Sequence, residues 1–279
     1  PDVEGDLTIS TRTLSLFDQR LQSKEGPITG RGILRAQLAP VTTLDIPDLA
    51  VELKPDVLHC QIGMQGEQSR YKVAGKVSLA ALQLAAKADL APLDGSVSGV
   101  LTIDAGPHTR LGGALDLRRI RLLYKGKPTA LSGLLRIDGD RIKSSSLTIK
   151  QDQMTADIMG TLTLGDTPVL TGELALDGLK IGPGSGGDLD FLQKFSAHGR
   201  VTATNLSYYG IPIAYGAAQA EVGKKGLRLV NMDLSGPPGT IKGSTLLNPD
   251  GSLAYDLNLA LRDTSMVEFI KALTPSASP

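Results

Sequence analysis

Apolar and polar side chains alternate along most of this chain. The segment 251–261 shows the pattern clearly, because Leu253, Tyr255, Leu257, Leu259 and Leu261 alternate with polar or small residues. Successive side chains of a β-strand point to opposite faces of the sheet, so a period of two predicts a half-buried strand. Similar segments recur roughly every 8 to 15 residues along the chain. The pattern therefore predicts an all-β protein.

Short turns separate the predicted strands. Asn248-Pro249-Asp250-Gly251 has Pro and Gly at turn positions, and Ile137-Asp138-Gly139-Asp140 contains the Asp-Gly pair that tight hairpins favour. Strands joined by such short connections pair antiparallel, because a parallel pair needs a long crossover. We therefore predict an elongated, curled antiparallel sheet built as a meander.

Helical patterns are few. In 188–195 and 264–273, apolar residues recur three or four positions apart behind an N-cap candidate. The segment 78–90 fits a helix or a strand. The sequence thus predicts two or three short helices. The glycine-rich stretch 183–187 is typical of a flexible linker and predicts a soft boundary there.

An internal repeat of about 84 residues is visible. Tyr, Gly and Pro of YKGKP (124–128) recur in YYGIP (208–212), and further glycines and leucines follow at nearly the same offset. Repeated units that stack on one another build an extended protein more readily than a globule. We expect three regions: 1–94, a repeat unit over 95–182, and a second unit over 183–279 that carries both predicted helices.

Charge and composition narrow the choice of partner. Lys plus Arg and Asp plus Glu both number 29, so there is no basic surplus of the kind that binds nucleic acid. Aromatic residues make up only 4% of the chain, too few for the stacking surfaces that bind bases. The single cysteine, Cys60, forms no intramolecular disulfide and is interpreted as a small buried apolar residue.

No segment has the run of about 18 apolar residues that a transmembrane helix needs. The chain opens on Pro1 without Met and without the pattern of a signal peptide. We expect it to be a fragment or a processed form whose anchor or targeting segment lies outside the sequence.

The C-terminal quarter resembles the AsmA family, which includes TamB-like and YhdP-like envelope proteins. The resemblance rests on the order of elements in 205–273. An alternating strand is followed by a Gly-x-Leu-x-Leu strand and a Gly-Thr-x-x-Gly strand. An Asp-Gly turn, a long alternating strand and an amphipathic helix come next. It covers 95–273 well and 1–94 loosely. One departure is Gly236-Pro237-Pro238-Gly239, where the family has a glycine-rich turn without prolines.

This resemblance implies a non-enzymatic periplasmic protein of Gram-negative bacteria, attached to the inner membrane by a segment absent here. Such proteins carry phospholipid or another acyl-chain lipid along an apolar β-groove during outer-membrane biogenesis. The groove lining expected from the alternation consists of Leu115, Leu117, Ile158, Leu162, Leu164, Leu174, Leu176, Leu253, Tyr255, Leu257, Leu259 and Leu261. Possible lipid headgroup contacts are Arg118, Arg119, Arg121 and Lys125.

No catalytic or metal-binding motif is found. His59, His108 and His198 are far apart and lack the spacing of metal ligands, and Asp138 and Asp140 fit a hairpin turn better than a calcium loop. The stretch 182–187 lacks the Lys-Ser/Thr of a phosphate-binding loop. We therefore expect no enzyme activity, no metal and no cofactor.

Two alternatives remain open. The strands could form a structural scaffold in an envelope or secretion assembly, with the apolar face covered by protein partners and no lipid carried. The segment 264–273 could cap the last edge strand, or it could dock onto a partner or a membrane.

Overall fold

The chain is almost entirely β-structure, as the alternation predicts. The computed structural model describes residues 2–16, 19–24, 26–37, 41–84, 90–124, 127–181, 196–208, 211–223, 226–237, 239–248 and 253–261. Contacts between residues divide the chain into two compact units, Pro1–Ile142 (unit 1) and Lys143–Pro279 (unit 2).

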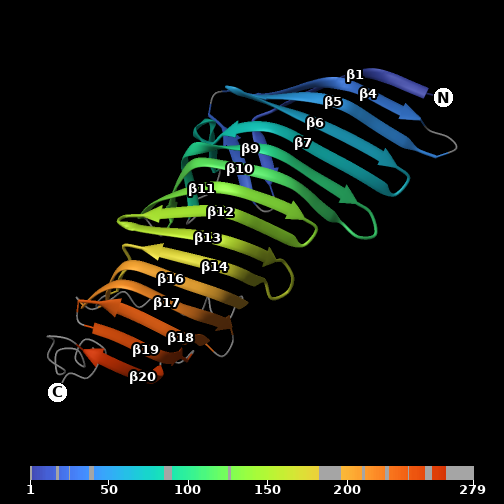
Figure 1. Cartoon of the computed structure of the whole chain (residues 1–279). Coiled ribbons are helices and arrows are strands. Elements are labelled where there is room, and N and C mark those ends of the chain that lie inside the picture. The colour runs from blue at the N-terminus through green and yellow to red at the C-terminus, as the bar shows by residue number, and fades with distance from the viewer. Residues whose placement is uncertain are drawn as a thin grey trace. The chain divides into compact units, whose positions relative to one another are not determined.

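Unit 1 is built on one antiparallel sheet. Its strands, in spatial order, are β1 (Asp2–Thr11), β4 (Ile28–Gln37), β5 (Thr43–Leu53), β6 (Asp56–Gln65), β7 (Gln68–Ser78), β9 (Leu90–Ala105), β10 (Arg110–Tyr124) and β11 (Lys127–Asp138). Three short strands, β2 (Thr13–Leu16), β3 (Gln19–Ser23) and β8 (Leu82–Leu84), form a second small sheet. From β4 onward the strands of the main sheet lie side by side in chain order (Figure 1).

Unit 2 holds most of β12 (Arg141–Gln151) and all later strands. These are β13 (Met154–Thr163), β14 (Val169–Asp177), β15 (Lys180–Ile181), β16 (Ser196–Tyr208), β17 (Ile211–Gly223), β18 (Gly226–Gly236), β19 (Gly239–Leu247) and β20 (Leu253–Leu261). The strands again follow chain order (Figure 1). Strands β14 and β15 pair with β16 in parallel. The pairs β13–β14, β16–β17, β17–β18, β18–β19 and β19–β20 are antiparallel, so the sheet is mixed. The sheets are curled and do not close into a barrel.

The hairpin turns lie where the sequence predicts them. Strand β11 ends at Asp138 and β12 begins at Arg141, so the predicted Asp-Gly turn connects them. Gly139 adopts a φ of 62°, a left-handed conformation that favours glycine because it has no Cβ. Strand β19 ends at Leu247 and β20 begins at Leu253, on either side of the predicted Pro-Asp-Gly turn.

Single-residue bulges interrupt several strands. In β10 the register with β11 shifts between Leu117 and Ile120, and Arg119 has a φ of 49°. In β18 the register with β19 shifts between Leu229 and Met232, and Asn231 has a φ of 51°. Each extra residue changes the phase of the alternation, so the apolar residues on both sides of the bulge stay on one face.

The predicted repeat is present in the strand pattern. Strands β11 and β17 begin at Lys127 and Ile211, and β12 and β18 begin at Arg141 and Gly226, so a five-strand unit recurs after about 84 residues. The predicted three-region division remains a prediction. Its first boundary lies inside β9, which runs continuously from Leu90 to Ala105, and its second lies beside residues that are not described.

The two better helix predictions, 188–195 and 264–273, lie outside the described residues. The ambiguous segment 78–90 contains one short 3-10 turn, Leu79–Ala81, followed by β8. That turn is the only helical element in the part of the chain that the structure describes.

Few apolar side chains are fully buried. Within the described ranges, twelve hydrophobic residues are buried and no polar or charged residue is. They form small clusters rather than one core: Ile28 packs with Leu53, and Met232 packs with Ile241. Most aliphatic side chains on the sheet faces are therefore only half-buried, and much apolar surface remains accessible.

Candidate functional site

One face of β13, β14, β16 and β17 in unit 2 carries no polar side chain over four residue positions per strand. These positions are directly paired across the strands, so their side chains share a face. We call them the apolar block. Its sixteen residues are Ala156, Ile158, Gly160, Leu162, Leu170, Gly172, Leu174, Leu176, Ala197, Gly199, Val201, Ala203, Gly216, Ala218, Ala220 and Val222.

The opposite face of the same strands is polar. On β14, Thr171, Glu173 and Asp177 are exposed, and on β16 the alternate residues include His198 and Arg200, which are also exposed. Thr171 and His198 are hydrogen-bonded through Oγ1 and Nε2 at 3.2 Å. The sheet of unit 2 is thus two-sided, with water on one face and an aliphatic surface on the other.

Glycine forms the middle row of the apolar block. Gly160, Gly172 and Gly199 are consecutive cross-strand partners, and Ala220 continues the row on β17. We call these four residues the glycine lane. Larger residues stand on both sides: on β14, Leu170 and Leu174 flank Gly172. The lane is therefore a shallow channel that crosses the strands between two aliphatic walls.

Close approach of neighbouring backbones explains the glycines. A Cβ added at Gly199 would lie 1.8 Å from the carbonyl oxygen of Gly172, and one added at Gly172 would lie 2.1 Å from the carbonyl oxygen of Met159. At Gly160 the corresponding distance to the Thr171 oxygen is 2.4 Å. Real side chains cannot occupy these positions without moving the backbone, so the fold itself keeps the lane floor free of side-chain atoms.

A cavity occupies the lane. Its volume is about 130 Å³. Its lining includes Ile158, Leu170, Gly172, Leu174, Ala197, Gly199, Val201, Ala220 and Val222 from the apolar block, with Met159, Glu173, His198 and Arg200 between them in sequence. Nine of the lining residues therefore belong to the apolar block, and they include Gly172, Gly199 and Ala220 of the glycine lane.

The predicted groove residues have several locations. Ile158, Leu162, Leu174 and Leu176 lie in the apolar block and are half-buried. Leu164 follows the last residue of β13 and is 39% exposed in the turn, outside the block. Leu115 and Leu117 lie on β10 in unit 1, where Leu117 is buried and is paired with Gly133 and Val97.

The five predicted residues of β20 share one face of its pairing with β19. Leu253, Tyr255, Leu257, Leu259 and Leu261 are opposite Leu247, Thr245, Gly243, Ile241 and Gly239. Leu257 packs against the cluster of Met232 and Ile241. The side chain of Leu257 is therefore part of a packed cluster and not of the open glycine lane.

Interpretation of the sequence missed the small residues of the lane. A signal for them is present: Ile158-x-Gly160-x-Leu162, Leu170-x-Gly172-x-Leu174 and Ala197-x-Gly199-x-Val201 repeat one motif in three strands. The motif marks glycine at an inward-facing position. The register that aligns the three glycines in one row comes only from the structure.

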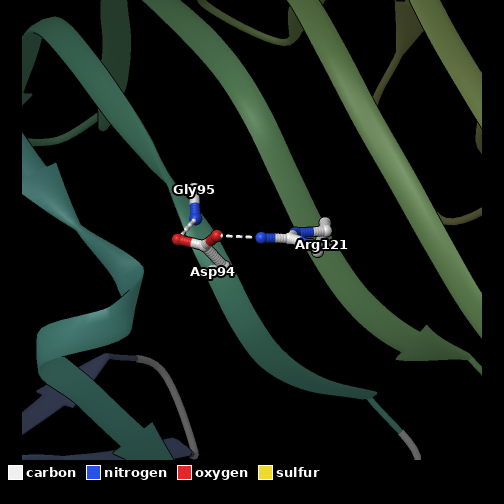
Figure 2. Close-up of polar contacts among 3 residues, drawn as sticks. All are labelled: Asp94, Gly95 and Arg121. Carbon is white, nitrogen blue, oxygen red and sulfur yellow. Dashed lines mark hydrogen bonds and ion pairs between the residues drawn. The ribbon is translucent and has the colours of Figure 1, made fainter.

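The predicted headgroup contacts lie on β10 in unit 1, and two of them are already paired. The Arg121 guanidinium donates to Asp94, whose other carboxylate oxygen accepts a 2.6 Å hydrogen bond from the Gly95 amide (Figure 2). These hydrogen bonds, first that of Arg121, lower the pKa of the Asp94 carboxyl. Arg118 pairs with Asp116 at 2.7 Å.

Of the remaining two, Arg119 is the bulge residue of β10, and its amide donates to the Ser132 hydroxyl at 3.2 Å. Its exposed guanidinium forms no ion pair with the described residues. Lys125 lies outside the described residues. Arg119 is thus the cation of this group that a lipid phosphate could reach without breaking an ion pair.

Larger hollows exist on the charged face of unit 1. Two adjoining hollows of about 660 and 670 Å³ share Asp45, Gly63, Arg70 and Asp104. They open above Gly63, which has no side chain, and the ion pair between Arg70 and Asp104 at 2.5 Å borders them. Their rims carry both charge signs on exposed side chains, which water screens. We therefore favour the smaller lane, whose lining points to one class of ligand.

A polar cluster holds the parallel junction beside the apolar block. Asp177, the last residue of β14, accepts hydrogen bonds from Thr204 Oγ1 at 2.7 Å and from Asn205 Nδ2 at 2.8 Å. These bonds, with the Gly178 amide, lower the pKa of the Asp177 carboxyl. Asn205 has a φ of 51°, which asparagine tolerates better than most residues. The cluster fixes the register of β14 against β16, on which the alignment of the glycine lane depends.

The three histidines do not converge. His59 pairs with Asp48 at 3.0 Å, and His198 with Thr171, on separate units. Among the described residues, no group of three His, Cys, Asp or Glu side chains could hold a metal ion. Cys60 is half-buried on the sheet, and burial, followed by the charge of Asp48, raises the pKa of its thiol.

No described helix has the length and apolar character needed to span a membrane. Comparisons of the chain with protein families, with curated proteins and with solved structures find no match.

Proposed function

We propose that this protein is a non-enzymatic carrier that binds or conducts phospholipid along an aliphatic sheet face. The observation that supports the proposal best is the apolar block, where sixteen paired positions on four strands carry neither a charge nor a side-chain hydrogen-bonding group. Soluble sheets seldom leave such a surface accessible unless it binds something. Each methylene group buried against it contributes about 0.8 kcal/mol.

The physical steps of carriage need no reactive residue. Acyl chains lie against the apolar block, and the headgroup stays in water at the edge of the sheet. No proton is moved and no charge is neutralised inside the apolar block, so binding depends on apolar area and shape.

The resemblance of 205–273 to the AsmA family supports a location for this activity. It implies a protein of the periplasm of a Gram-negative bacterium, attached to the inner membrane. Carriage of phospholipid toward the outer membrane is then the biological role that we propose.

The test is native mass spectrometry of the purified chain, followed by lipid extraction from the same sample. Leu174→Asp places a carboxylate in the apolar block, and Ala175→Asp places the same group on the exposed face one residue away. We expect phospholipid at a defined stoichiometry on the unmodified chain and on Ala175→Asp, and loss of at least about nine-tenths of it on Leu174→Asp. Circular dichroism confirms that each variant is folded.

Val201→Thr is a milder second variant, in case Leu174→Asp unfolds. It changes one methyl group of the apolar block to a hydroxyl and should reduce the bound lipid. A folded protein that carries no lipid, or that carries as much lipid on Leu174→Asp as on Ala175→Asp, would contradict the proposal. In that case a structural scaffold, with the apolar block covered by a protein partner, becomes the better interpretation.

A further inference from the structure

We propose that the glycine lane is a selectivity element, which accepts one unbranched phospholipid acyl chain across the strands and excludes methyl-branched chains. This inference rests on the proposed function and adds which chains are carried and how they lie. It is drawn from the register of four strands and from the residues that form the floor and the walls of the lane.

The register sets the direction and the length of the lane. Gly160, Gly172, Gly199 and Ala220 are successive partners on β13, β14, β16 and β17, so the lane runs at right angles to the strands. Three inter-strand spacings of about 4.8 Å make it about 14 Å long. On β18, the partner of Ala220 is Leu229, so the row of small residues ends there.

The walls set the width. On β14, Leu170 and Leu174 stand on either side of Gly172, four residues apart, which is about 13 Å between their Cα atoms. On β16, Ala197 and Val201 flank Gly199 in the same way, and all four flanking residues line the hollow. What remains above the glycines is a narrow channel that suits a single hydrocarbon chain.

The floor cannot move to admit a wider ligand. It consists of backbone atoms that approach so closely that a Cβ at Gly199 would be 1.8 Å from the Gly172 oxygen. A chain with methyl branches must therefore displace the half-buried wall leucines, Leu170 and Leu174, from the contacts that they make. An unbranched chain makes contact along the whole floor without displacing them.

The chemistry of the lining points to the same class of ligand. None of the sixteen side chains of the apolar block carries a charge or a hydrogen-bonding group, so the matching part of the ligand must be equally nonpolar. The block contains no aromatic residue that would stack on a planar ring. A flexible aliphatic chain complements this surface better than a sterol or an aromatic compound does.

The first experiment compares two vesicle preparations with the same headgroup, one with unbranched and one with methyl-branched acyl chains. The chain is incubated with vesicles of dioleoylphosphatidylglycerol or of diphytanoylphosphatidylglycerol, separated from them, and the carried lipid is measured by mass spectrometry. We expect at least about tenfold more dioleoyl than diphytanoyl lipid. Equal carriage of both would overturn the selectivity proposal and leave the proposed function standing, whereas carriage of neither would contradict both.

The second experiment fills the lane. Ala220→Leu puts a larger side chain on the lane floor at a residue that already has a Cβ, and Ala217→Leu adds the same atoms on the opposite face of β17. We expect about a tenfold loss of dioleoyl lipid for Ala220→Leu and no change for Ala217→Leu.

If Ala220→Leu is unfolded by circular dichroism, Ala220→Val provides a smaller obstruction and a smaller expected loss. An unchanged lipid load in a folded Ala220 variant, or equal losses at both positions, would contradict the location of the chain in the lane.

Discussion

The two halves of the sheet in unit 2 use glycine in opposite ways. In the glycine lane, three glycines line up across β13, β14 and β16, and two of them, Gly172 and Gly199, line a hollow. Farther along the sheet, Gly243 of β19 lies between Met232 of β18 and Leu257 of β20, and these side chains pack together with Ile241. One glycine leaves space that its neighbours fill, whereas three aligned glycines leave a channel.

The difference arises from the register and from the size of the flanking residues. A Cβ added at Gly243 would lie 2.0 Å from the carbonyl oxygen of Asp256, so the close approach of a neighbouring backbone resembles that at Gly199. Long, flexible Met232 reaches over it, because methionine adapts to irregular gaps. The corresponding neighbour in the lane is Ala220, which is too short to do so. An open site on a sheet thus needs small residues in adjacent strands at the same register position.

The largest expected effect concerns the backbone approach in the lane. Gly199→Ala forces a Cβ against the Gly172 oxygen, and we expect it to lower the free energy of unfolding by about 3 kcal/mol. Gly165→Ala, in the β13–β14 turn with open space around it, is the matched control and should be nearly neutral. Denaturant unfolding measures both, and similar values for the two variants would mean that the strands at the lane can separate at low cost.

A smaller difference in the free energy of unfolding is expected between the packed cluster around Met232 and the open glycine lane. Met232→Ala removes a buried side chain from a packed cluster and should cost about 2 kcal/mol, whereas Leu174→Ala removes a half-buried one and should cost about 1 kcal/mol. The measurement is denaturant unfolding of lipid-free protein. A cost at Leu174 as large as that at Met232 would show that the lane is packed and not open.

The smallest effect depends on pH. The pKa of Asp177 is lowered in the folded protein, so its contribution to stability is present above the unfolded-state pKa of about 3.9 and is lost as the pH falls through the folded value. Asp177→Asn should therefore lower the thermal midpoint near neutral pH and have little effect in strong acid.

Asp166→Asn, in the exposed β13–β14 turn, is the control for the change of charge. A difference between Asp177→Asn and the unmodified protein that persists unchanged at low pH would show that packing, and not the carboxylate, holds the parallel junction.

Much of the strand architecture could be predicted from the sequence, because alternation acts locally. The segment 251–261 gave strand β20 with its apolar face, and Ile137-Asp138-Gly139-Asp140 gave the β11–β12 turn. The repeat at about 84 residues reappears as the five-strand unit. The parallel pairing of β14 with β16 was not predicted, because it joins segments separated by 182–195 and short-range patterns contain no information on it.

The candidate site was predicted only in its walls. The alternation of large apolar side chains identified Ile158, Leu162, Leu174 and Leu176, because such side chains give the strongest hydrophobic signal in a sequence. The floor consists of glycine and alanine, whose hydrophobicity is too weak to stand out in the sequence pattern. The alignment of these residues in one row depends on the pairing of strands that are distant in sequence. Leu164 was included by extending the alternation one residue beyond the end of β13, where the turn begins and the side chain is exposed.

The bulge at Arg119 determines which residues tolerate insertion or deletion. Before it, the inward residues of β10 are odd-numbered, as at Leu115 and Leu117, and after it they are even-numbered, as at Ile120. Deleting Arg119 would remove the bulge but keep Ile120 on the aliphatic side and Arg121 on the charged side, because Arg119 is the extra residue. Deleting a residue from a regular stretch of the strand would instead turn every later side chain to the other face, much as a lost nucleotide shifts a reading frame. Bulges and turns are therefore the places where related chains could gain or lose a single residue.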